Sequence, residues 1–286
     1  MTDKYAVIGN PIAHSKSPLI HQMFAAQTGH DISYEAILAP LDGFAATVER
    51  LRDQGYKGCN VTVPFKFEAC RIVNDVTSKV IDVFDLGENA DAINTLVFRN
   101  NKIIGGNTDG VGLVRDITQN LNSNVAGKRV LLMGAGGAAC GVVHPLLDQR
   151  PQEFVIANRT LENAIKFKQT IRGTAQFPVR SVSVSSYPNL SGKQFDIVIN
   201  ATSASLMDEM PNIPKTIFAP GALAYDMMYG RDTPFMKFAR EHGAAIVSDG
   251  LGMLVEQAAE SFYIWRGVRP DTASVLKKLR AELPIA

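Results

Sequence analysis

A glycine turn between an apolar run and a helical stretch constrains the fold of this chain more than any other feature. The turn Gly134-Ala135-Gly136-Gly137-Ala138-Ala139 fits the pattern G-x-G-x-x-A. The apolar run Lys128–Met133 precedes it, and the amphipathic stretch Gly137–Leu147 follows. Such glycines allow a tight turn and a close approach of backbone to a pyrophosphate, which the free N–H groups of the helix attract. The sequence therefore predicts a Rossmann-like domain that binds a dinucleotide.

Short β-branched runs alternate with helical stretches along the chain, which is typical of an α/β protein with largely parallel sheets. In the N-terminal part we expect the strands Tyr5–Gly9, Ser33–Leu38 and Gly58–Val63, and a hairpin of Ile93–Phe98 and Lys102–Gly106 that turns at Asn100-Asn101. Helices are expected from Pro18 with Ser17 as N-cap, over Leu41–Gly55, and after Pro64 to about Phe84. Further on we expect a helix after Asp109, the strands Lys128–Met133, Phe154–Ala157, Phe195–Asn200, Ala222–Tyr225 and Ala244–Ser248, and the helices Gly137–Leu147, Leu161–Ile171, Met253–Arg266 and Thr272–Leu283.

Length and composition limit the kind of protein. A chain of 286 residues suggests two domains, and the polar stretch Ser123–Gly127 looks like the start of the second. With 29 Lys and Arg against 28 Asp and Glu, there is no basic footprint for nucleic acid or anionic lipid. No signal peptide or membrane span is recognised. The three cysteines, Cys59, Cys70 and Cys140, lack C-x-x-C spacing, so we expect reduced thiols in the cytoplasm rather than disulfides or zinc.

The end of the next strand indicates which dinucleotide is bound. An NAD site usually places Asp or Glu about 20 residues after the glycines, to bind the ribose 2′-hydroxyl. Here the strand Phe154–Ala157 ends in Asn158-Arg159-Thr160, with no carboxylate. The planar guanidinium of Arg159 suits a 2′-phosphate, with an amide and a hydroxyl on either side. The alternative is a surface arginine followed by Thr160 as a helix N-cap. We favour NADP.

Polar residues of the N-terminal part stand at expected strand ends. Ser15 and Ser17, next to the free N–H groups of a helix, make a plausible carboxylate cradle, although Ser17 alone would be only a cap. Lys66 follows one strand and Asp109 another; alone they would be a solvated lysine and an N-cap. Together, such a pair can relay the proton that an alcohol loses as hydride leaves its carbon. The five histidines are scattered, and we expect no metal site.

With these motifs in view, the chain resembles the shikimate/quinate dehydrogenase family, and within it the NADP-dependent shikimate dehydrogenases. The resemblance runs almost end to end. Besides the glycine turn and Asn158-Arg159-Thr160, it depends on the following segments: Gly9-Asn10-Pro11, His14–Pro18, Asn60–Lys66, Ala92–Thr95, Gly106–Gly110, Asn200–Ser203, Tyr225–Tyr229 and Asp249–Leu254.

The resemblance implies a reversible, NADP-dependent reduction of 3-dehydroshikimate to shikimate, in aromatic amino-acid biosynthesis. It implies Lys66 and Asp109 as the catalytic pair. Further roles follow by motif: Ser15, Ser17 and Tyr229 bind the substrate carboxylate, Thr62, Asn94 and Gln257 bind the ring hydroxyls, and Gly134, Ala135, Gly136, Gly137, Ala138, Asn158, Arg159, Thr160, Thr202, Ser203, Met227 and Gly250 bind the cofactor. The C-terminal helices then return to the substrate domain. We therefore expect a substrate domain over 1–110 and 250–286 and an NADP-binding domain over 111–249.

Some positions depart from the family pattern. Cys140 stands where many members carry Arg, and Asn163 stands where a second basic residue often helps to hold the phosphate. Both changes remove positive charge, which Lys166 and Lys168 could partly restore. A quinate/shikimate dehydrogenase that uses NAD or both cofactors is the closest alternative, and a non-catalytic dinucleotide-binding regulator is a more distant one. The sequence leaves open whether the chain forms a homodimer, and which of Lys66 and Asp109 accepts the proton.

Overall fold

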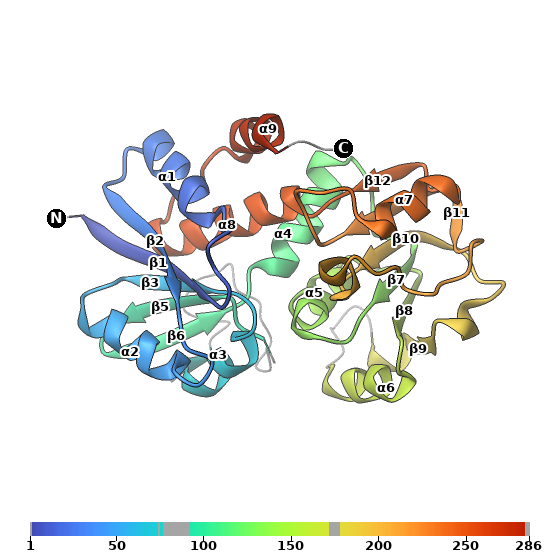
Figure 1. Cartoon of the computed structure of the whole chain (residues 1–286), viewed down its shortest axis with the longest axis horizontal. Coiled ribbons are helices and arrows are strands. Elements are labelled where there is room, and N and C mark those ends of the chain that lie inside the picture. The colour runs from blue at the N-terminus through green and yellow to red at the C-terminus, as the bar shows by residue number, and fades with distance from the viewer. Residues whose placement is uncertain (1, 74, 77–91, 172–177, 284–286) are drawn as a thin grey trace. The chain divides into compact units, whose positions relative to one another are not determined.

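The computed structural model of the chain describes residues 2–73, 75–76, 92–171 and 178–283 (Figure 1). They form two compact units. The first unit comprises Met1–Asp109 and Val255–Val275, and the second comprises Gly110–Leu254 and Leu276–Ala286. No helix within the described ranges is long and apolar enough to cross a membrane.

The first unit is built on a six-stranded sheet with the strand order β2-β1-β3-β5-β6-β4. Its strands are β1 (Asp3–Gly9), β2 (Ile32–Leu38), β3 (Gly58–Val61), β4 (Asp75–Val76), β5 (Thr95–Arg99) and β6 (Lys102–Gly106). Strand β1 runs parallel to β2 and β3, whereas β5 is antiparallel to both of its neighbours. The predicted hairpin is confirmed: Asn100 and Asn101 turn it with φ angles of 52° and 61°, as a two-residue hairpin turn requires.

Helices cover both faces of this sheet. In Figure 1, α1 (Ser17–Thr28) and α8 (Leu251–Arg266) lie on one side, and α2 (Phe44–Asp53) and α3 (Lys66–Ile72) lie on the other. Side chains of β1 alternate between the two, because successive residues of a strand point to opposite faces. Ala6 and Ile8 belong to the core that includes Phe44, while Tyr5 stacks on Trp265 of α8 at 4.5 Å.

The second unit has a six-stranded sheet in which every strand is parallel to its neighbours. Its strands are β7 (Arg129–Met133), β8 (Glu153–Asn158), β9 (Val182–Ser186), β10 (Phe195–Asn200), β11 (Phe218–Asp226) and β12 (Ile246–Ser248). Read from β9, the order β9-β8-β7-β10-β11-β12 is the 3-2-1-4-5-6 arrangement of dinucleotide-binding sheets. The predicted α/β class and Rossmann-like unit are confirmed.

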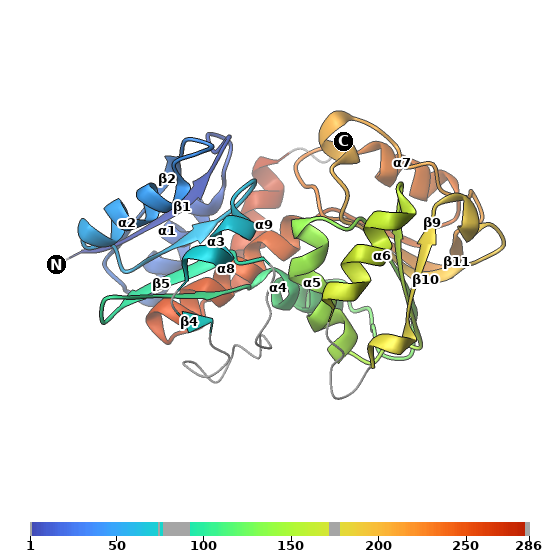
Figure 2. The same cartoon turned by 90° about the horizontal axis from the view of Figure 1, so that it is seen from below.

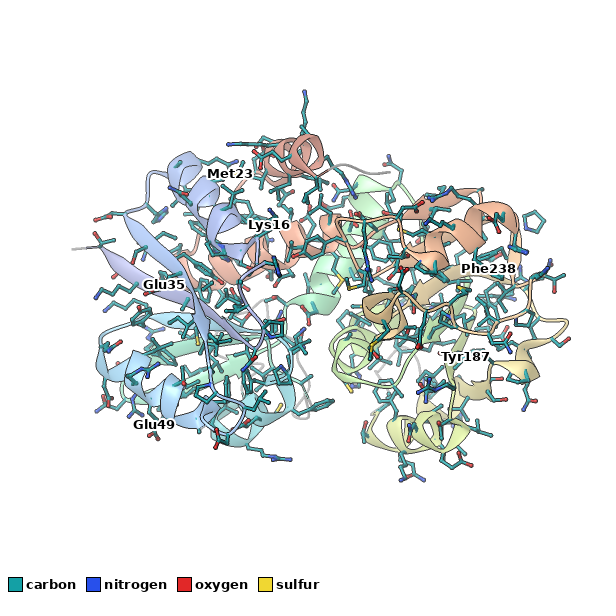
Figure 3. All side chains as sticks on the ribbon, in the orientation of Figure 1. Lys16, Met23, Glu35, Glu49, Tyr187 and Phe238 are labelled. Carbon is teal, nitrogen blue, oxygen red and sulfur yellow. The ribbon has the colours of Figure 1, made fainter. Side chains whose placement is uncertain are left out.

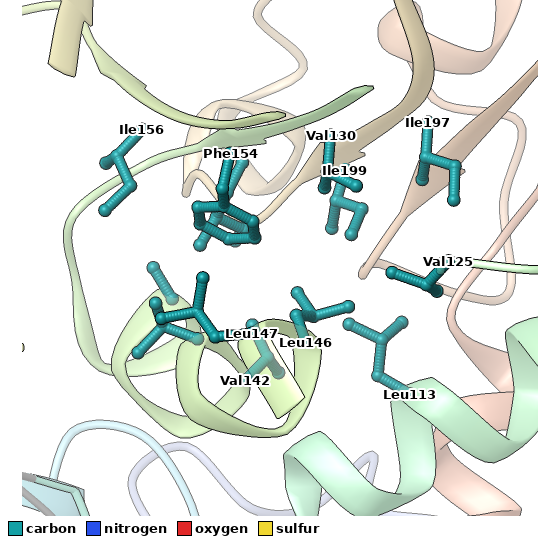
Figure 4. Packing of buried hydrophobic residues seen from close by; sticks show 14 of the residues in the cluster. Leu113, Val125, Val130, Val142, Leu146, Leu147, Phe154, Ile156, Ile197 and Ile199 are labelled. Atoms are coloured by element: carbon teal, nitrogen blue, oxygen red, sulfur yellow. The ribbon is translucent and has the colours of Figure 1, made fainter. Parts of the chain in front are cut away.

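Two apolar cores flank the second sheet. On one face α5 (Gly137–Asp148) and α6 (Leu161–Thr170) pack on it, and Val142 and Leu146 of α5 lie beneath Val130 and Ile199 (Figures 2 and 4). On the other face α7 (Pro234–Glu241) contributes Phe235. The remaining α-helices of the described residues are α4 (Asp109–Arg115, continued by a π-helical segment Asp116–Asn120) and α9 (Thr272–Glu282).

Several predicted boundaries are wrong. Strand β3 ends at Val61 rather than Val63, because residues 62–65 form a turn that contains a cis Val63–Pro64 bond. The helix predicted after Pro64 ends at Ile72, where Val73 is extended and β4 follows; the remainder of that prediction, to Phe84, falls partly on residues 77–91, outside the described residues. Helix α2 spans only Phe44–Asp53.

The strands β4 and β9, the helix α7 and three short 3-10 helices, Val179–Ser181, Pro188–Leu190 and Ala204–Met207, were not predicted. Ser17 is also not the cap of α1, because the helix already includes it and Lys16 stands in the N-cap position (Figure 3). The Ser17 N–H instead donates to Oγ of Ser15 at 3.3 Å, so a neighbouring hydroxyl satisfies one of the free donors of the first turn.

Candidate active site

The catalytic pair predicted from the sequence is brought into direct contact. Lys66 Nζ lies 2.5 Å from Asp109 Oδ2. The side chains are 16% and 8% exposed, so solvent screens the pair only weakly. Lys66 begins α3 and Asp109 begins α4, each a few residues beyond a strand end. Because β3 and β6 are both antiparallel to β5, they run the same way and their carboxyl ends meet at one edge of the sheet.

Asn94 holds the aspartate from the other side. It precedes β5, whose antiparallel direction brings its start to the same edge. Asn94 Nδ2 donates to Asp109 Oδ1 at 2.8 Å, while Asn94 Oδ1 accepts the backbone N–H of Thr108 at 2.8 Å. The backbone N–H of Asp109 donates to Asn107 Oδ1 at 2.8 Å. The two carboxylate oxygens therefore have different partners, one a cation and the other a neutral amide.

Gln257 joins this network from α8. Its Oε1 accepts from Asn94 Nδ2 at 3.3 Å and from the Thr108 hydroxyl at 3.2 Å. Val255–Val275 belongs to the first unit, so this part of α8 packs beside the strand-end residues, as the resemblance implied for Gln257. Asn94, Thr108 and Gln257 are buried. Asp109, Asn94, Thr108 and Gln257 are thus linked to one another by hydrogen bonds in a buried environment.

The predicted substrate residues Ser15, Ser17 and Thr62 follow parallel strands of the same sheet. Ser15 and Ser17 come after β1, and Thr62 comes directly after β3, where its backbone N–H continues the ladder to Ile8 O at 2.9 Å. All three stand at the edge that carries Lys66 and Asp109. The remaining predicted carboxylate ligand, Tyr229, lies in the second unit, where burial raises the pKa of its phenol.

The glycine turn has the features that a pyrophosphate site needs. Gly134 has a φ of 111°, and a Cβ there would lie 2.9 Å from Ala201 O, so only glycine fits. A Cβ at Gly136 would meet nothing within 4 Å, which leaves open space in front of this backbone. Gly136 is the N-cap of the 12-residue helix α5 and no side chain caps it. The N–H groups of Gly137 and Ala138 thus face outward from the helix start and can bind an anion.

The other predicted cofactor residues stand at the carboxyl ends of the parallel strands. Asn158 Nδ2 donates to Thr160 O at 2.9 Å, which shapes the turn after β8, and the Arg159 side chain next to it is exposed. Thr160 is the N-cap of α6 by position, but its hydroxyl makes no capping bond. Burial raises the pKa of Tyr187 to about 12, and the charge of the Arg159 guanidinium opposes that rise.

The four residues predicted to line the nicotinamide end follow other strands of this sheet. Thr202 and Ser203 follow β10, and the Thr202 hydroxyl donates to Asn200 Oδ1 at 2.7 Å. Met227 follows β11 and Gly250 follows β12. A Cβ on Gly250 would lie 2.3 Å from Met227 O, so these two segments pack backbone to backbone. The residues fit a dinucleotide with a 2′-phosphate: free helix N–H groups, an exposed arginine and no carboxylate at the end of β8.

Sequence reasoning missed several residues of both sites. Thr95, Ser261 and Tyr34 take part in the hydrogen bonds behind Asn94; Thr95 lies in the segment Ala92–Thr95 but received no role, and Ser261 and Tyr34 stand outside every motif. In the second unit, Asp226 is fully buried and accepts from the hydroxyls of Ser205 at 2.8 Å and Thr233 at 2.6 Å. An aspartate at the end of an apolar strand was the available signal for this last group.

Comparison with known proteins agrees with the resemblance drawn from the motifs. Residues 7–96 match the model of the shikimate dehydrogenase substrate binding domain, residues 116–208 that of shikimate/quinate 5-dehydrogenase, and residues 250–280 that of the shikimate 5′-dehydrogenase C-terminal domain. A protein of Methylobacillus flagellatus named shikimate dehydrogenase (NADP(+)) is 55% identical over 279 residues, which is 98% of this chain and 99% of that protein.

Solved structures agree as well. An Ael1 enzyme from Pseudomonas putida has a TM-score of 0.87 at 44% identity, covering 97% of this chain and 98% of its own. Shikimate 5-dehydrogenase from Thermus thermophilus, solved in complex with NADP(H) and shikimate, has a TM-score of 0.83 at 26% identity, covering 99% and 100%. With end-to-end coverage and identities above half the residues, the chain belongs to the shikimate dehydrogenase family.

Proposed function

We propose that this chain catalyses the reversible, NADP-dependent reduction of 3-dehydroshikimate to shikimate, a step of aromatic amino-acid biosynthesis. The contact between Lys66 Nζ and Asp109 Oδ2 is the observation that carries the proposal. It places a cation and a carboxylate within one hydrogen bond at a strand-end edge, where the oxygen of a secondary alcohol can be bound and its proton moved. Relatives at 51–55% identity bear the name shikimate dehydrogenase (NADP(+)).

The proton step follows from the pair and its support. When an alcohol is oxidised, its hydroxyl proton must leave as the hydrogen on the same carbon leaves with its electrons. Lys66 Nζ and Asp109 Oδ2 share one short contact, so the two side chains can together hold the reacting oxygen and move its proton. In the reduction direction the pair returns the proton to the carbonyl oxygen. The bond from Asn94 Nδ2 keeps Asp109 Oδ1 occupied, which leaves Oδ2 and Nζ for the reacting oxygen.

The substrate would be held by groups around this pair. We propose that the hydroxyls of Ser15 and Ser17, with Tyr229, bind the carboxylate, and that Thr62, Asn94 and Gln257 bind the ring hydroxyls. Asn94 and Gln257 support this because they already bond each other beside Asp109. Tyr229 keeps its proton at neutral pH, because burial raises its phenol pKa, and a protonated phenol is a donor to a carboxylate.

The second unit would hold NADP, which accepts hydride from the alcohol carbon or supplies it to the carbonyl carbon. We propose that the backbone of Gly134, Ala135, Gly136, Gly137 and Ala138 binds the pyrophosphate. Asn158, Arg159 and Thr160 would bind the 2′-phosphate, and Thr202, Ser203, Met227 and Gly250 would line the nicotinamide end. The proposal includes two domains: a substrate domain of residues 1–110 and 250–286, and an NADP-binding domain of residues 111–249. It also includes a cytoplasmic location and no nucleic-acid or membrane partner.

Initial rates with shikimate and with quinate, each with NADP and with NAD, test the proposed function. We expect shikimate with NADP to give the highest kcat/KM of the four. The absence of a carboxylate after β8 and the exposed Arg159 are the reasons for the cofactor preference. A higher kcat/KM for quinate with NAD would replace the proposal by the quinate-oxidising alternative. Binding of NADP without turnover of either substrate would instead indicate a non-catalytic regulator.

A further inference from the structure

We propose that Tyr34 and Ser261 are positioning residues for the proton relay, acting on Asp109 through Asn60 and Asn94. Neither residue touches Lys66 or Asp109 in the described contacts. They form the far end of a hydrogen-bonded chain that starts on the edge strand β2 and on helix α8 and ends at the carboxylate. The inference deepens the proposed function, because it assumes that Asp109 and Lys66 move the proton of the substrate alcohol.

The chain begins at the phenol of Tyr34. Its hydroxyl donates to Asn60 Oδ1 at 2.7 Å, and burial raises the Tyr34 pKa well above 10, so the phenol remains a donor across the working pH range. The Tyr34 ring is held by His21, which stacks on it at 4.1 Å with an interplanar angle of 6°. Burial lowers the His21 pKa to about 3, so the stacked imidazole is neutral. The phenol therefore has a fixed place and a fixed protonation state.

The bond from Tyr34 fixes the orientation of the Asn60 side-chain amide, and that orientation determines which groups its Nδ2 contacts. An amide oxygen only accepts and an amide nitrogen only donates, so a donor on Oδ1 determines which way the side chain is turned. With Oδ1 directed at Tyr34, Asn60 Nδ2 donates to the carbonyl of Asn94 at 3.1 Å, to Thr95 Oγ1 at 3.0 Å and to Ser261 Oγ at 2.9 Å. A rotated amide would direct its oxygen at the Asn94 carbonyl, which also only accepts.

The two hydroxyls then direct Asn94. Because Thr95 Oγ1 accepts from Asn60, its own proton is available to Asn94 Oδ1, 2.9 Å away. Ser261 Oγ accepts from Asn60 as well, donates to Gln257 O at 3.1 Å, and lies 2.9 Å from Thr95 Oγ1 and 3.2 Å from Thr108 Oγ1. Two donors, Thr95 Oγ1 and the Thr108 N–H, now fix the Asn94 oxygen. Asn94 Nδ2 is left to face Asp109.

The consequence for the reaction is a matter of geometry. Asp109 has one oxygen fixed by Asn94 and the other on Lys66, so a disturbance of the Asn94 amide lets the carboxylate rotate away from the lysine. Small misplacements of reacting groups reduce the rate far more than they reduce binding. Loss of a remote hydroxyl in this chain should therefore lower kcat while leaving the KM for NADP unchanged.

The first test removes the hydroxyl of Tyr34 and compares it with a matched control. We expect Tyr34→Phe to lower kcat for shikimate oxidation about tenfold, the effect of leaving one buried acceptor without its donor. Tyr56→Phe is the control, because Tyr56 is in the same unit and its hydroxyl bonds only to Glu35 in the described contacts. It should change kcat less than about twofold. An unchanged kcat for Tyr34→Phe, or a higher KM for shikimate at unchanged kcat, would overturn the proposal.

The second test separates positioning from general destabilisation. In the Asn94→Ala background the chain to Asp109 is already broken, so Tyr34→Phe should lower kcat no further than about twofold. A structural role for Tyr34 would keep its full tenfold effect in that background and would contradict the inference. Ser261→Ala should follow the same pattern with a smaller first effect, about threefold, because Ser261 supports Asn60 and Thr108 rather than Asn94 directly.

The outcome also distinguishes this inference from the proposed function. If the wild-type protein does not oxidise shikimate with NADP, the proposed function fails and the variants say nothing against the network as a structure. If the wild type is active and the Tyr34 variant behaves like the Tyr56 control, only the positioning role fails. Melting temperatures of all variants, measured with NADP absent, confirm that each rate refers to folded protein.

Discussion

The carboxyl ends of the strands carry different kinds of chemical group in the two units. In the first unit they carry a closed set of side chains: Lys66, Asp109, Asn94, Thr108 and Gln257 bond one another and are mostly buried. In the second unit the corresponding edge offers the backbone of a glycine turn, open space at Gly136, and the exposed side chains of Arg159 and Ser203. One edge is built from side chains that bond one another, while the other consists of backbone groups and exposed side chains.

This difference indicates that the edge of the first sheet serves proton transfer and the edge of the second serves cofactor binding. Proton transfer needs groups held to within a fraction of an ångström, and buried, mutually bonded side chains provide that. A dinucleotide that must be exchanged at every turnover is better bound by backbone N–H groups and a flexible arginine, which cost little to leave solvated. Substitutions in the first unit should therefore act on kcat, and those in the second unit on cofactor affinity.

The largest effect is expected at Lys66. Lys66→Ala removes the cation that shares the proton with Asp109, so kcat should fall at least about 100-fold, as is typical when an acid–base group is lost. The Kd for NADP should stay within about twofold of wild type, because the lysine is in the other unit. Steady-state oxidation of shikimate and titration of NADP measure the two quantities.

Lys57→Ala is the matched control for that variant. Lys57 is an exposed lysine just before β3, at the opposite end of the same strand from Lys66, and its replacement should leave kcat unchanged. A fully active Lys66→Ala enzyme would remove Lys66 from the mechanism and with it the comparison between a chemical edge and a binding edge.

The next effect is expected at Arg159, on binding alone. Arg159→Ala should raise the KM for NADP about 10- to 100-fold, the loss of about 1.5–3 kcal/mol from bonds to a charged phosphate, and should leave kcat nearly unchanged. The KM for NAD, which has no 2′-phosphate, should change little. Lys193→Ala is the control: this exposed lysine precedes β10, at the opposite edge of the sheet. An equal rise in the KM for NADP and in the KM for NAD would disprove a 2′-phosphate site at Arg159.

The same contrast explains what could be predicted from the sequence. The backbone features of the second unit are local, so the strand β7, the glycine turn and the helix α5 were predicted to within a residue, as was Asn158-Arg159-Thr160 at the end of β8. Lys66 and Asp109 were also found, because parallel strands bring their carboxyl ends to one edge. These inferences need only the period of the apolar residues and the direction of strands.

The supporting residues could not be found in this way. Tyr34 and Ser261 come from β2 and α8, and only the packed structure brings them to Asn60, which the segment Asn60–Lys66 already contained. Their side chains follow ordinary patterns: Tyr34 is a strand aromatic and Ser261 a small residue on a buried helix face. Ser17 was predicted to cap α1, but Lys16 occupies the cap position, which depends on where the preceding loop bends. Tertiary contacts therefore determine what local propensity cannot.

A third prediction concerns the pH dependence of stability in the first unit. The native His21 has its pKa lowered by burial to about 3, against 6.5 for an unfolded histidine. Above pH 6.5 both states are neutral and the shift has no effect. As the pH falls below 6.5 the unfolded state takes up a proton that the native state refuses, so the free energy of unfolding should fall by about 2 kcal/mol between pH 7 and pH 5.

His21→Phe isolates this contribution. Phenylalanine can keep the stacking on Tyr34 but does not titrate, so its stability curve should be flatter than that of the wild type by about 2 kcal/mol over the same interval. Urea unfolding at both pH values, in wild type and variant, measures the difference. All other acid effects are common to the two proteins, and parallel curves would show that His21 is not the group responsible.

The smallest effect is expected at Cys140, close to the glycine turn, where many members of the family carry an arginine. Cys140 is the fourth residue of α5, near the helix start that we propose for the pyrophosphate. Cys140→Arg should lower the Kd for NADP about two- to fivefold, because one added, partly solvated cation near a phosphate contributes about 0.5–1 kcal/mol. Cys140→Met is the control, since it adds length without charge. If both variants lower the Kd for NADP equally, packing rather than charge is the cause. If only the arginine lowers it, and the effect shrinks at high salt, electrostatic attraction to solvent-exposed phosphates determines the affinity at this edge. The edge of Lys66 and Asp109 differs, because buried side chains there bond one another directly.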